Sequence, residues 1–159
     1  ETFQAGLSWS MILHKRENFR RAFDNFDVKK IAAYDEEKIQ QLMADSTIIR
    51  NRGKIRAAVH NAQIFLDIQK QYGSFSSYLW QFTAGNIIVN MDDHIPPCTE
   101  LSDRVSADLQ RRGMRYTGTV TIYSYLQAVG VVNDHELNCF CRSKSLCGGA
   151  RGTAYTKKR

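Results

Sequence analysis

The sequence has no run of about 18 apolar residues, so no part of it is expected to cross a membrane as a helix. Residues 1–9 also lack the charged start and the long apolar stretch of a secretion signal, and there is no initiator methionine. We therefore expect a cytoplasmic protein without a secretion leader, and we take Glu1 as a truncation point.

Cysteine and proline are scarce. The four cysteines stand at positions 98, 139, 141 and 147, without the dense, regular spacing of a small disulfide-stapled domain. A reduced, intracellular protein is the better interpretation. Both prolines fall within residues 85–99, which we predict to be a loop.

Apolar residues make up 43% of the 159 positions, which suits one domain with one core. The net charge is +6 and the pI is about 9.3, and this basic balance favours a polyanionic partner. The positive charge gathers at residues 50–56, at residues 111–115 and at residues 157–159. The alternative for each group is an ordinary solvated surface, which is the preferred interpretation for residues 157–159.

Helical periodicity predominates, and the predicted fold is a single all-α domain over residues 1–141, followed by a loose basic tail over 142–159. We predict helices over 5–24, from Asp27 to Tyr34, from Asp35, from Lys54 to Gln71, over 74–82, from Ser102 to Arg112, and over 119–129. The last has a β-branched start, but no partner strand is apparent, so a helix is preferred.

A basic connection joins two amphipathic helices within residues 39–59. Arg50, Arg52, Gly53 and Lys54 surround the point where the second helix is expected to begin. Glycine permits a positive φ or a close backbone approach, and a helix N-terminus binds anions, so a DNA phosphate fits here. The alternative is an ordinary helix–helix connection with a basic rim.

Four separated motifs occur in sequence. They are ETFQAGLSW with KRENFR at residues 1–20, IIRNRGKI at 48–55, RGMRYTGT at 112–119 and YSYLQAVGVVNDH at 123–135. Over residues 1–141 the chain resembles the bacterial 3-methyladenine DNA glycosylase I family, of the helix-hairpin-helix superfamily. The hairpin has one glycine, as in that family, where the common form has two.

The resemblance implies a monofunctional N-glycosylase that extrudes and releases 3-methyladenine from alkylated double-stranded DNA, acts as a monomer and does not nick the strand. It also implies an N-terminal segment, absent here, with a Cys-Gly-Trp, a His and several aromatics. Two alternatives remain open. One is a non-catalytic helix-hairpin-helix DNA-binding module, and the other is a helical protein-interaction domain with a zinc clasp.

Site residues also follow from the resemblance. Glu1 corresponds to the base-binding glutamate, the catalytic position, and Trp9 and Ser124 to an aromatic and a hydroxyl of the base pocket. Gly6 and Leu7 correspond to the pair beside the extruded nucleotide. Each has a simpler reading: a helix N-terminal acid for Glu1, core packing for Trp9 and Leu7, and a hydroxyl bound to its own helix for Ser124.

His135 and Cys139 have the spacing H-x3-C, which suits one tetrahedral Zn²⁺. They correspond to the C-terminal half of the family's structural zinc site, whose other two ligands lie in the absent segment. His94 and Cys98 repeat the spacing, so a site closed within this chain is the alternative. Cys141 and Cys147 are further candidates for replacing a ligand.

Overall fold

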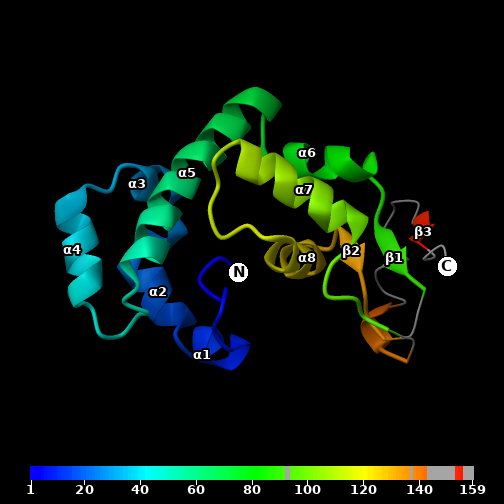
Figure 1. The fold of residues 1–159 in the computed structure, drawn as a ribbon, viewed down its shortest axis with the longest axis horizontal. Helices are drawn as coiled ribbons and strands as arrows, with labels where there is room; N and C mark the ends of the chain where they lie inside the picture. The colour runs from blue at the N-terminus through cyan, green and yellow to red at the C-terminus, as the bar shows by residue number, and fades with distance from the viewer. Residues whose placement is uncertain (92–93, 137, 143–152, 156–159) are drawn as a thin grey trace.

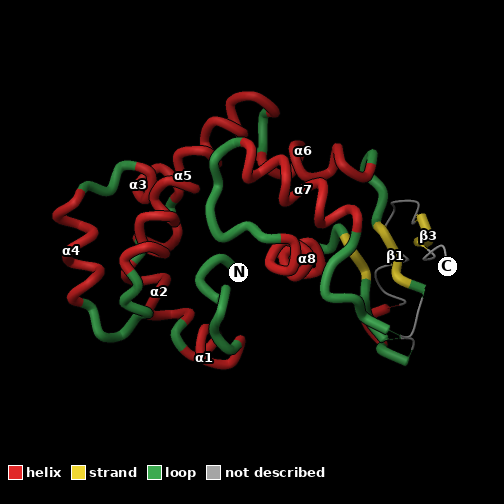
Figure 2. The backbone as a smooth tube through the Cα atoms, viewed as in Figure 1, coloured by secondary structure: helices red, strands yellow, loops and turns green. Residues whose placement is uncertain are grey.

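A computed structural model describes residues 1–91, 94–136, 138–142 and 153–155, and these residues are mostly helical (Figure 2). The all-α prediction is confirmed, with three very short strands added. In chain order the elements are α1 (Trp9–His14), α2 (Arg16–Ala22), η1 (Asp24–Phe26), α3 (Val28–Ala32), α4 (Glu36–Ala44), α5 (Arg52–Tyr72), α6 (Phe75–Trp80), η2 (Gln81–Thr83), β1 (Ile88–Asn90), α7 (Glu100–Arg111), α8 (Thr119–Ala128), β2 (Val132–Asn133) and β3 (Thr153–Tyr155). Across the described residues, no helix is both long enough and apolar enough to span a bilayer.

Side-chain caps begin the helices of the N-terminal half where the sequence predicts them. The Asp27 carboxylate accepts hydrogen bonds from the N–H groups of Lys29 and Lys30 at 2.9 and 3.3 Å, and Asp35 accepts one from Lys38 N–H at 2.8 Å. A carboxylate at this position satisfies N–H groups that have no partner within the helix. The predicted starts of α3 and α4 are therefore confirmed.

Three local predictions are wrong. Residues 5–24 do not form one helix: residues 1–8 form turns, and a break at Lys15 separates α1 from α2. Thr99, not Ser102, is the N-cap of α7. The Ser102 hydroxyl accepts from Thr99 N–H at 2.8 Å, which completes a capping box. The predicted loop over residues 85–99 contains β1.

The strands form a small parallel sheet in the order β2–β1–β3. Ile88 pairs with Val132 on one side and with Thr153 on the other. Residues 153–155 thus carry regular structure within the predicted loose tail, whereas residues 143–152 and 156–159 lie outside the described part. The helix predicted over residues 119–129 is confirmed as α8.

Two groups of buried side chains are joined by α5, which runs between the two halves of the molecule in Figure 1. Ile55 and Val59 belong to the N-terminal core, with side chains of α2, α3 and α4. Ile64 and Ile68, further along α5, belong to the C-terminal core, with side chains of α6, α7 and α8. One continuous helix therefore sets the spacing between the two halves.

We predict that Ile55→Ala lowers the free energy of unfolding by about 2–5 kcal/mol, because the side chain is fully buried and its loss leaves a cavity. Denaturant unfolding followed by circular dichroism measures this. Val120→Ala is the control: this α8 side chain is 56% exposed, and its loss should change stability by about 0.5 kcal/mol or less. Equal effects of the two substitutions would contradict the assigned core.

Candidate functional site

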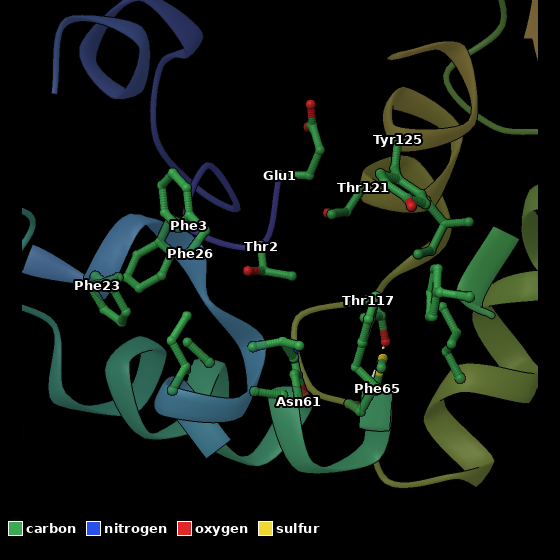
Figure 3. A pocket seen from close by; sticks show the side chains of 18 residues that line it. Glu1, Thr2, Phe3, Phe23, Phe26, Asn61, Phe65, Thr117, Thr121 and Tyr125 are labelled. Carbon is green, nitrogen blue, oxygen red and sulfur yellow. Dashed lines mark hydrogen bonds between the residues drawn. The ribbon is translucent and has the colours of Figure 1, made fainter. Parts of the chain in front are cut away.

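A cavity of about 470 Å³ opens between the two halves, and its lining is mostly apolar. One wall carries Phe3, Phe23 and Phe26, and the opposite wall carries Thr121 and Tyr125 of α8 (Figure 3). The remaining lining residues are Glu1, Thr2, Val28, Ile31, Ala58, Asn61, Ala62, Phe65, Phe75, Leu109, Met114, Thr117 and Ile122. A volume of this size between aromatic walls is typical of a small-molecule site.

One face of α5 lines the cavity between these walls. Ala58, Asn61, Ala62 and Phe65 all line it, at the spacing that places side chains on one face of a helix. The Asn61 amide nitrogen donates to the backbone carbonyl of Arg115 at 2.9 Å, and its oxygen accepts from Arg115 N–H at 2.8 Å. This paired contact fixes the connection between α7 and α8 against α5, and with it the C-terminal wall.

Phe26 is held at the cavity by an unusual turn. Residues 24–26 have φ values of 49°, 56° and 61°, so consecutive non-glycine residues are left-handed, at a cost of about 1–2 kcal/mol each. The Tyr34 hydroxyl donates to the Asp24 carboxylate at 2.5 Å, and Lys38 lies 3.7 Å from the same oxygen. These contacts anchor a turn that leaves the Phe26 side chain 49% exposed beside Phe3.

Asp24 and Tyr34 shift each other's pKa. The hydrogen bond from the Tyr34 hydroxyl, helped by the positive charge of Lys38, holds the pKa of Asp24 below its usual value. Burial, with the Asp24 charge nearby, raises the pKa of the Tyr34 hydroxyl. Asp24 is therefore charged, and Tyr34 is protonated, at neutral pH.

Glu1 lies between the phenylalanines of one wall and Thr121 and Tyr125 of the other (Figure 3). It is not the first-turn acid of a helix, because α1 begins only at Trp9, where Ser8 is the cap. The reading of Glu1 as an acid that interacts with a helix dipole is therefore wrong. Glu1 is one of the residues that line the cavity.

Two other predicted pocket residues lie outside the cavity lining. Trp9 is 52% exposed, so it is neither a core residue nor a lining residue. The Ser124 hydroxyl donates to the carbonyl of Val120 at 3.2 Å within its own helix, and the α8 side chains that line the cavity are Thr121, Ile122 and Tyr125. The helical phase of α8 directs Tyr125, not Ser124, toward this cavity. The base-pocket roles of Trp9 and Ser124 stay predictions.

Gly6 and Leu7 follow Glu1 in the same irregular segment. Gly6 has a φ of +74° and is exposed, and Leu7 N–H donates to the carbonyl of Gln4 at 2.7 Å. Leu7 belongs to neither buried cluster in the described part of the chain, so the core reading is not supported for it. Gly6 is thus at the surface and Leu7 is half-buried, in the same segment as Glu1.

The basic connection between α4 and α5 is exposed, but its cations differ. Arg50 has no ion-pair partner within the described residues, whereas Arg52 pairs with Glu36 at 3.3 Å. Gly53 is the second residue of α5 and does not have a positive φ. A side chain there would instead meet the Tyr116 hydroxyl, 3.1 Å from the position of an added Cβ.

Lys54 is not the surface cation that the sequence predicts. Its side chain is buried, and its ammonium donates to the carbonyls of Phe3 and Ala5 at 2.8 and 2.5 Å. Because α5 begins at Arg52, position 54 is turned from the exposed end of the helix toward the N-terminal segment. The positive charge of Lys54 is therefore satisfied by backbone carbonyls inside the molecule and is not accessible to a phosphate.

His135 and Cys139 lie side by side, with Sγ 3.6 Å from Nδ1. Tetrahedral zinc, with a Zn–S distance of about 2.3 Å and a Zn–N distance of about 2.0 Å, separates the two ligand atoms by roughly 3.5 Å. The pair thus fits half of such a site. No group of three or more potential ligands is assembled among the described residues, so the alternative set with His94 and Cys98 does not form there.

Comparison with known proteins bears on this geometry. A sequence profile of the methyladenine glycosylase family matches residues 1–142. The chain belongs to that family. DNA-3-methyladenine glycosylase 1 of Escherichia coli K12 is 42% identical over 141 residues, covering 87% of this chain and 75% of that protein.

Solved structures of methyladenine glycosylases have the same fold. A crystal structure of 3-methyladenine DNA glycosylase I has a TM-score of 0.82 at 42% identity, covering 88% of this chain and 79% of that one. A single-residue variant of 3-methyladenine DNA glycosylase I, crystallised in complex with 3-methyladenine, has a TM-score of 0.83 at 32% identity, covering 89% and 77%.

Sequence reasoning overlooked most of the cavity. The i, i+4 pair Thr121 and Tyr125, and the α5 face from Ala58 to Phe65, have a helical spacing that marks shared faces. That spacing cannot say which face borders a cavity and which a core. Phe3 and Phe26 lie in irregular backbone, where no periodic signal exists.

We predict that Tyr34→Phe raises the pKa of Asp24 toward the ordinary value of about 3.9, because the largest cause of its lowering is lost. A carboxyl-carbon NMR titration measures this. A depressed folded-state pKa stabilises the fold above the unfolded value, and this stability is lost as pH falls through the folded pKa. The variant should therefore lose less stability than the parent on acidification.

Tyr116→Phe is the control for Tyr34→Phe. It removes a hydroxyl from a tyrosine that is not among the groups that shift the Asp24 pKa, so it should leave that pKa unchanged. An Asp24 pKa that is the same in the parent and in Tyr34→Phe would contradict the anchor.

Proposed function

We propose that this chain is a DNA-3-methyladenine glycosylase, which hydrolyses the N-glycosyl bond of alkylated adenine in DNA and releases the free base. The observation that carries the proposal is the apolar cavity with aromatic walls that Glu1 helps to line. The complex of a related glycosylase with 3-methyladenine supports it. A non-catalytic DNA-binding module would have no use for such a cavity.

The chemistry needs recognition more than a strong nucleophile. A base methylated at N3 is cationic in DNA, so it leaves as neutral 3-methyladenine when the bond to C1′ breaks. Water supplies the oxygen that replaces the base at C1′, and a proton is released.

The cavity residues have matching roles. The Glu1 carboxylate accepts a hydrogen bond from the exocyclic amine and offsets the positive charge of the base. The rings of Phe3, Phe26 and Tyr125 supply faces on which a flat cation can stack. Burial raises the pKa of the Tyr125 hydroxyl, so this ring remains neutral beside the cation. The target nucleotide must leave the duplex to reach them.

We assign DNA contact to the exposed start of α5 and to the neighbouring irregular segment. Arg50 and Arg52 bring positive charge to a helix N-terminus, where Gly53 leaves the backbone uncovered. Gly6 and Leu7 meet the duplex beside the extruded nucleotide, where an apolar side chain fills space left in the stack. The substrate is alkylated double-stranded DNA, and the enzyme works as a cytoplasmic monomer.

We also assign a structural Zn²⁺ to His135 and Cys139, with two further ligands from outside the described residues. The 3.6 Å separation of their ligand atoms supports the assignment. The Arg142 guanidinium donates to the carbonyls of His135 and Asn90 at 2.5 and 2.6 Å, so the loop that carries both ligands is tied to β1. When bound, zinc would link this loop to the segment that supplies the other ligands.

We predict that Glu1→Gln lowers the rate of 3-methyladenine release by about 10- to 100-fold, because a charged acceptor that makes a hydrogen bond of roughly 1.5–3 kcal/mol is replaced by a neutral one. Base release from methylated duplex DNA measures this. The affinity for undamaged duplex should remain within about twofold, because phosphate contacts carry no base information. Equal release by variant and parent would rule out the role of Glu1. A parent that releases no base would rule out the proposed function.

A second prediction concerns the metal. Cys139→Ser and His135→Ala should each lower the zinc content and speed transfer of zinc to a chromophoric chelator, because each removes one ligand. His94→Ala, the control, should leave both unchanged. Loss of zinc from His94→Ala, or full zinc retention by both His135→Ala and Cys139→Ser, would contradict the assignment.

A further inference from the structure

The Lys54 side chain is 7% exposed, and its ammonium donates to two backbone carbonyls of the N-terminal segment, Phe3 at 2.8 Å and Ala5 at 2.5 Å. The same ammonium lies 5.8 Å from the centre of the Tyr116 ring. No carboxylate lies within ion-pair distance of it in the described part of the chain. A buried cation without an acid is expensive unless other groups satisfy it, so these carbonyls are its main compensation.

The segment that Lys54 holds has little structure of its own. Residues 1–8 form turns, in which Gln4 N–H donates to the carbonyl of Glu1 at 3.0 Å and Leu7 N–H to that of Gln4 at 2.7 Å. The Phe3 ring packs against Phe19, with ring centres 4.6 Å apart. Such packing gives affinity but little direction, whereas two hydrogen bonds to carbonyls two residues apart fix the path of the backbone.

We propose that Lys54 is a positioning residue for the base-binding site, which holds residues 1–7 in the conformation that places Glu1 in the cavity. The inference rests on the proposed function, since Glu1 is the carboxylate assigned there to the base. Glu1 stands two residues before one anchored carbonyl, and Gly6 and Leu7 directly follow the other. Lys54 therefore positions both the base contact and the pair assigned beside the extruded nucleotide, a contact that an undamaged duplex does not make.

The position of Lys54 in the chain adds to this role. It lies in the first turn of α5, directly after the exposed residues Arg50, Arg52 and Gly53. The Asn51 side chain caps that turn by accepting from Lys54 N–H at 3.0 Å. The backbone of residue 54 thus belongs to the DNA-facing end of the helix, while its side chain holds the base-binding segment. Burial lowers the pKa of this ammonium, which agrees with its enclosed position.

The test is Lys54→Met, which keeps the length and apolar stem of the side chain and removes its donors. We expect a 10- to 100-fold lower rate of 3-methyladenine release from methylated duplex, from the loss of charge-assisted hydrogen bonds. The affinity for undamaged duplex should stay within about twofold of the parent, with an unchanged salt dependence. Lys70→Met is the matched control on the same helix, because Lys70 is exposed and forms a surface ion pair with Asp67.

Two readouts separate positioning from general stability. Amide hydrogen exchange at Gln4 and Leu7 should accelerate in Lys54→Met, while exchange in the middle of α5 stays as in the parent. Lys54→Arg, which restores donors, should recover part of the activity. If Lys54→Met fails to fold, Lys54→Ala with added methylammonium, ethylammonium or propylammonium takes its place, and base release should rise with the concentration of the cation.

Several results would overturn the proposal. Base release by Lys54→Met at the parent rate would do so, as would unaltered exchange at Gln4 and Leu7. Weaker binding to undamaged duplex, with a salt slope smaller by about one and base release from bound DNA intact, would identify Lys54 as a phosphate contact instead. Failure of the proposed function looks different: the parent would release no base, while exchange at Gln4 and Leu7 would still respond to Lys54→Met.

Discussion

The architecture depends on the burial of one helix in two cores. Along α5, Ile55 and Val59 pack into the N-terminal core, and Ile64 and Ile68 into the C-terminal core. Between these sets, the face formed by Ala58, Asn61, Ala62 and Phe65 borders the cavity. A continuous helix is stiff, so the distance between the cavity walls is set by the pitch of α5 and not by the loops around it.

Polar contacts from α5 fix the positions of the irregular segments that flank it. Asn61 holds the backbone of Arg115, and Lys54 holds the backbone of Phe3 and Ala5. Both side chains come from α5, and each makes two hydrogen bonds to irregular backbone. Irregular segments carry unpaired backbone groups that need partners when they are shielded from water. Here the partners are side chains of α5, so both cavity walls are held in place by the same helix.

How much of this can be predicted from the sequence depends on whether a signal is local. The caps Asp27 and Asp35, and the apolar stripe of α5, are local signals, and they predict their helices correctly. The burial of Lys54 cannot be predicted from local sequence, because it depends on carbonyls about fifty residues earlier in the chain. A lysine in a basic cluster ordinarily faces water, and nothing nearby in the sequence marks this one as different.

The same distinction explains the candidate site. The resemblance assigns a base-binding role to the individual position Glu1, and this residue lines the cavity. Trp9 and Ser124 do not line the cavity in this structure, because the orientation of a side chain depends on where its helix begins and on what packs beside it. Phe26 could not be found from the sequence: Asp24 and Asn25 tolerate a left-handed backbone, but a phenylalanine in such a turn contradicts its local propensity.

That turn also limits how the cavity can diversify among related sequences. Position 26 has a φ of 61°, which a β-branched side chain adopts only with severe crowding. Leucine, tyrosine or methionine can replace the phenylalanine with no added backbone penalty, but valine and isoleucine are effectively closed to it. Evolution can thus adjust the length and polarity of this wall at position 26 but not its branching, so a β-branched side chain that narrows the cavity must stand elsewhere in the lining, for example at Ala58 or Ala62 on the helical face.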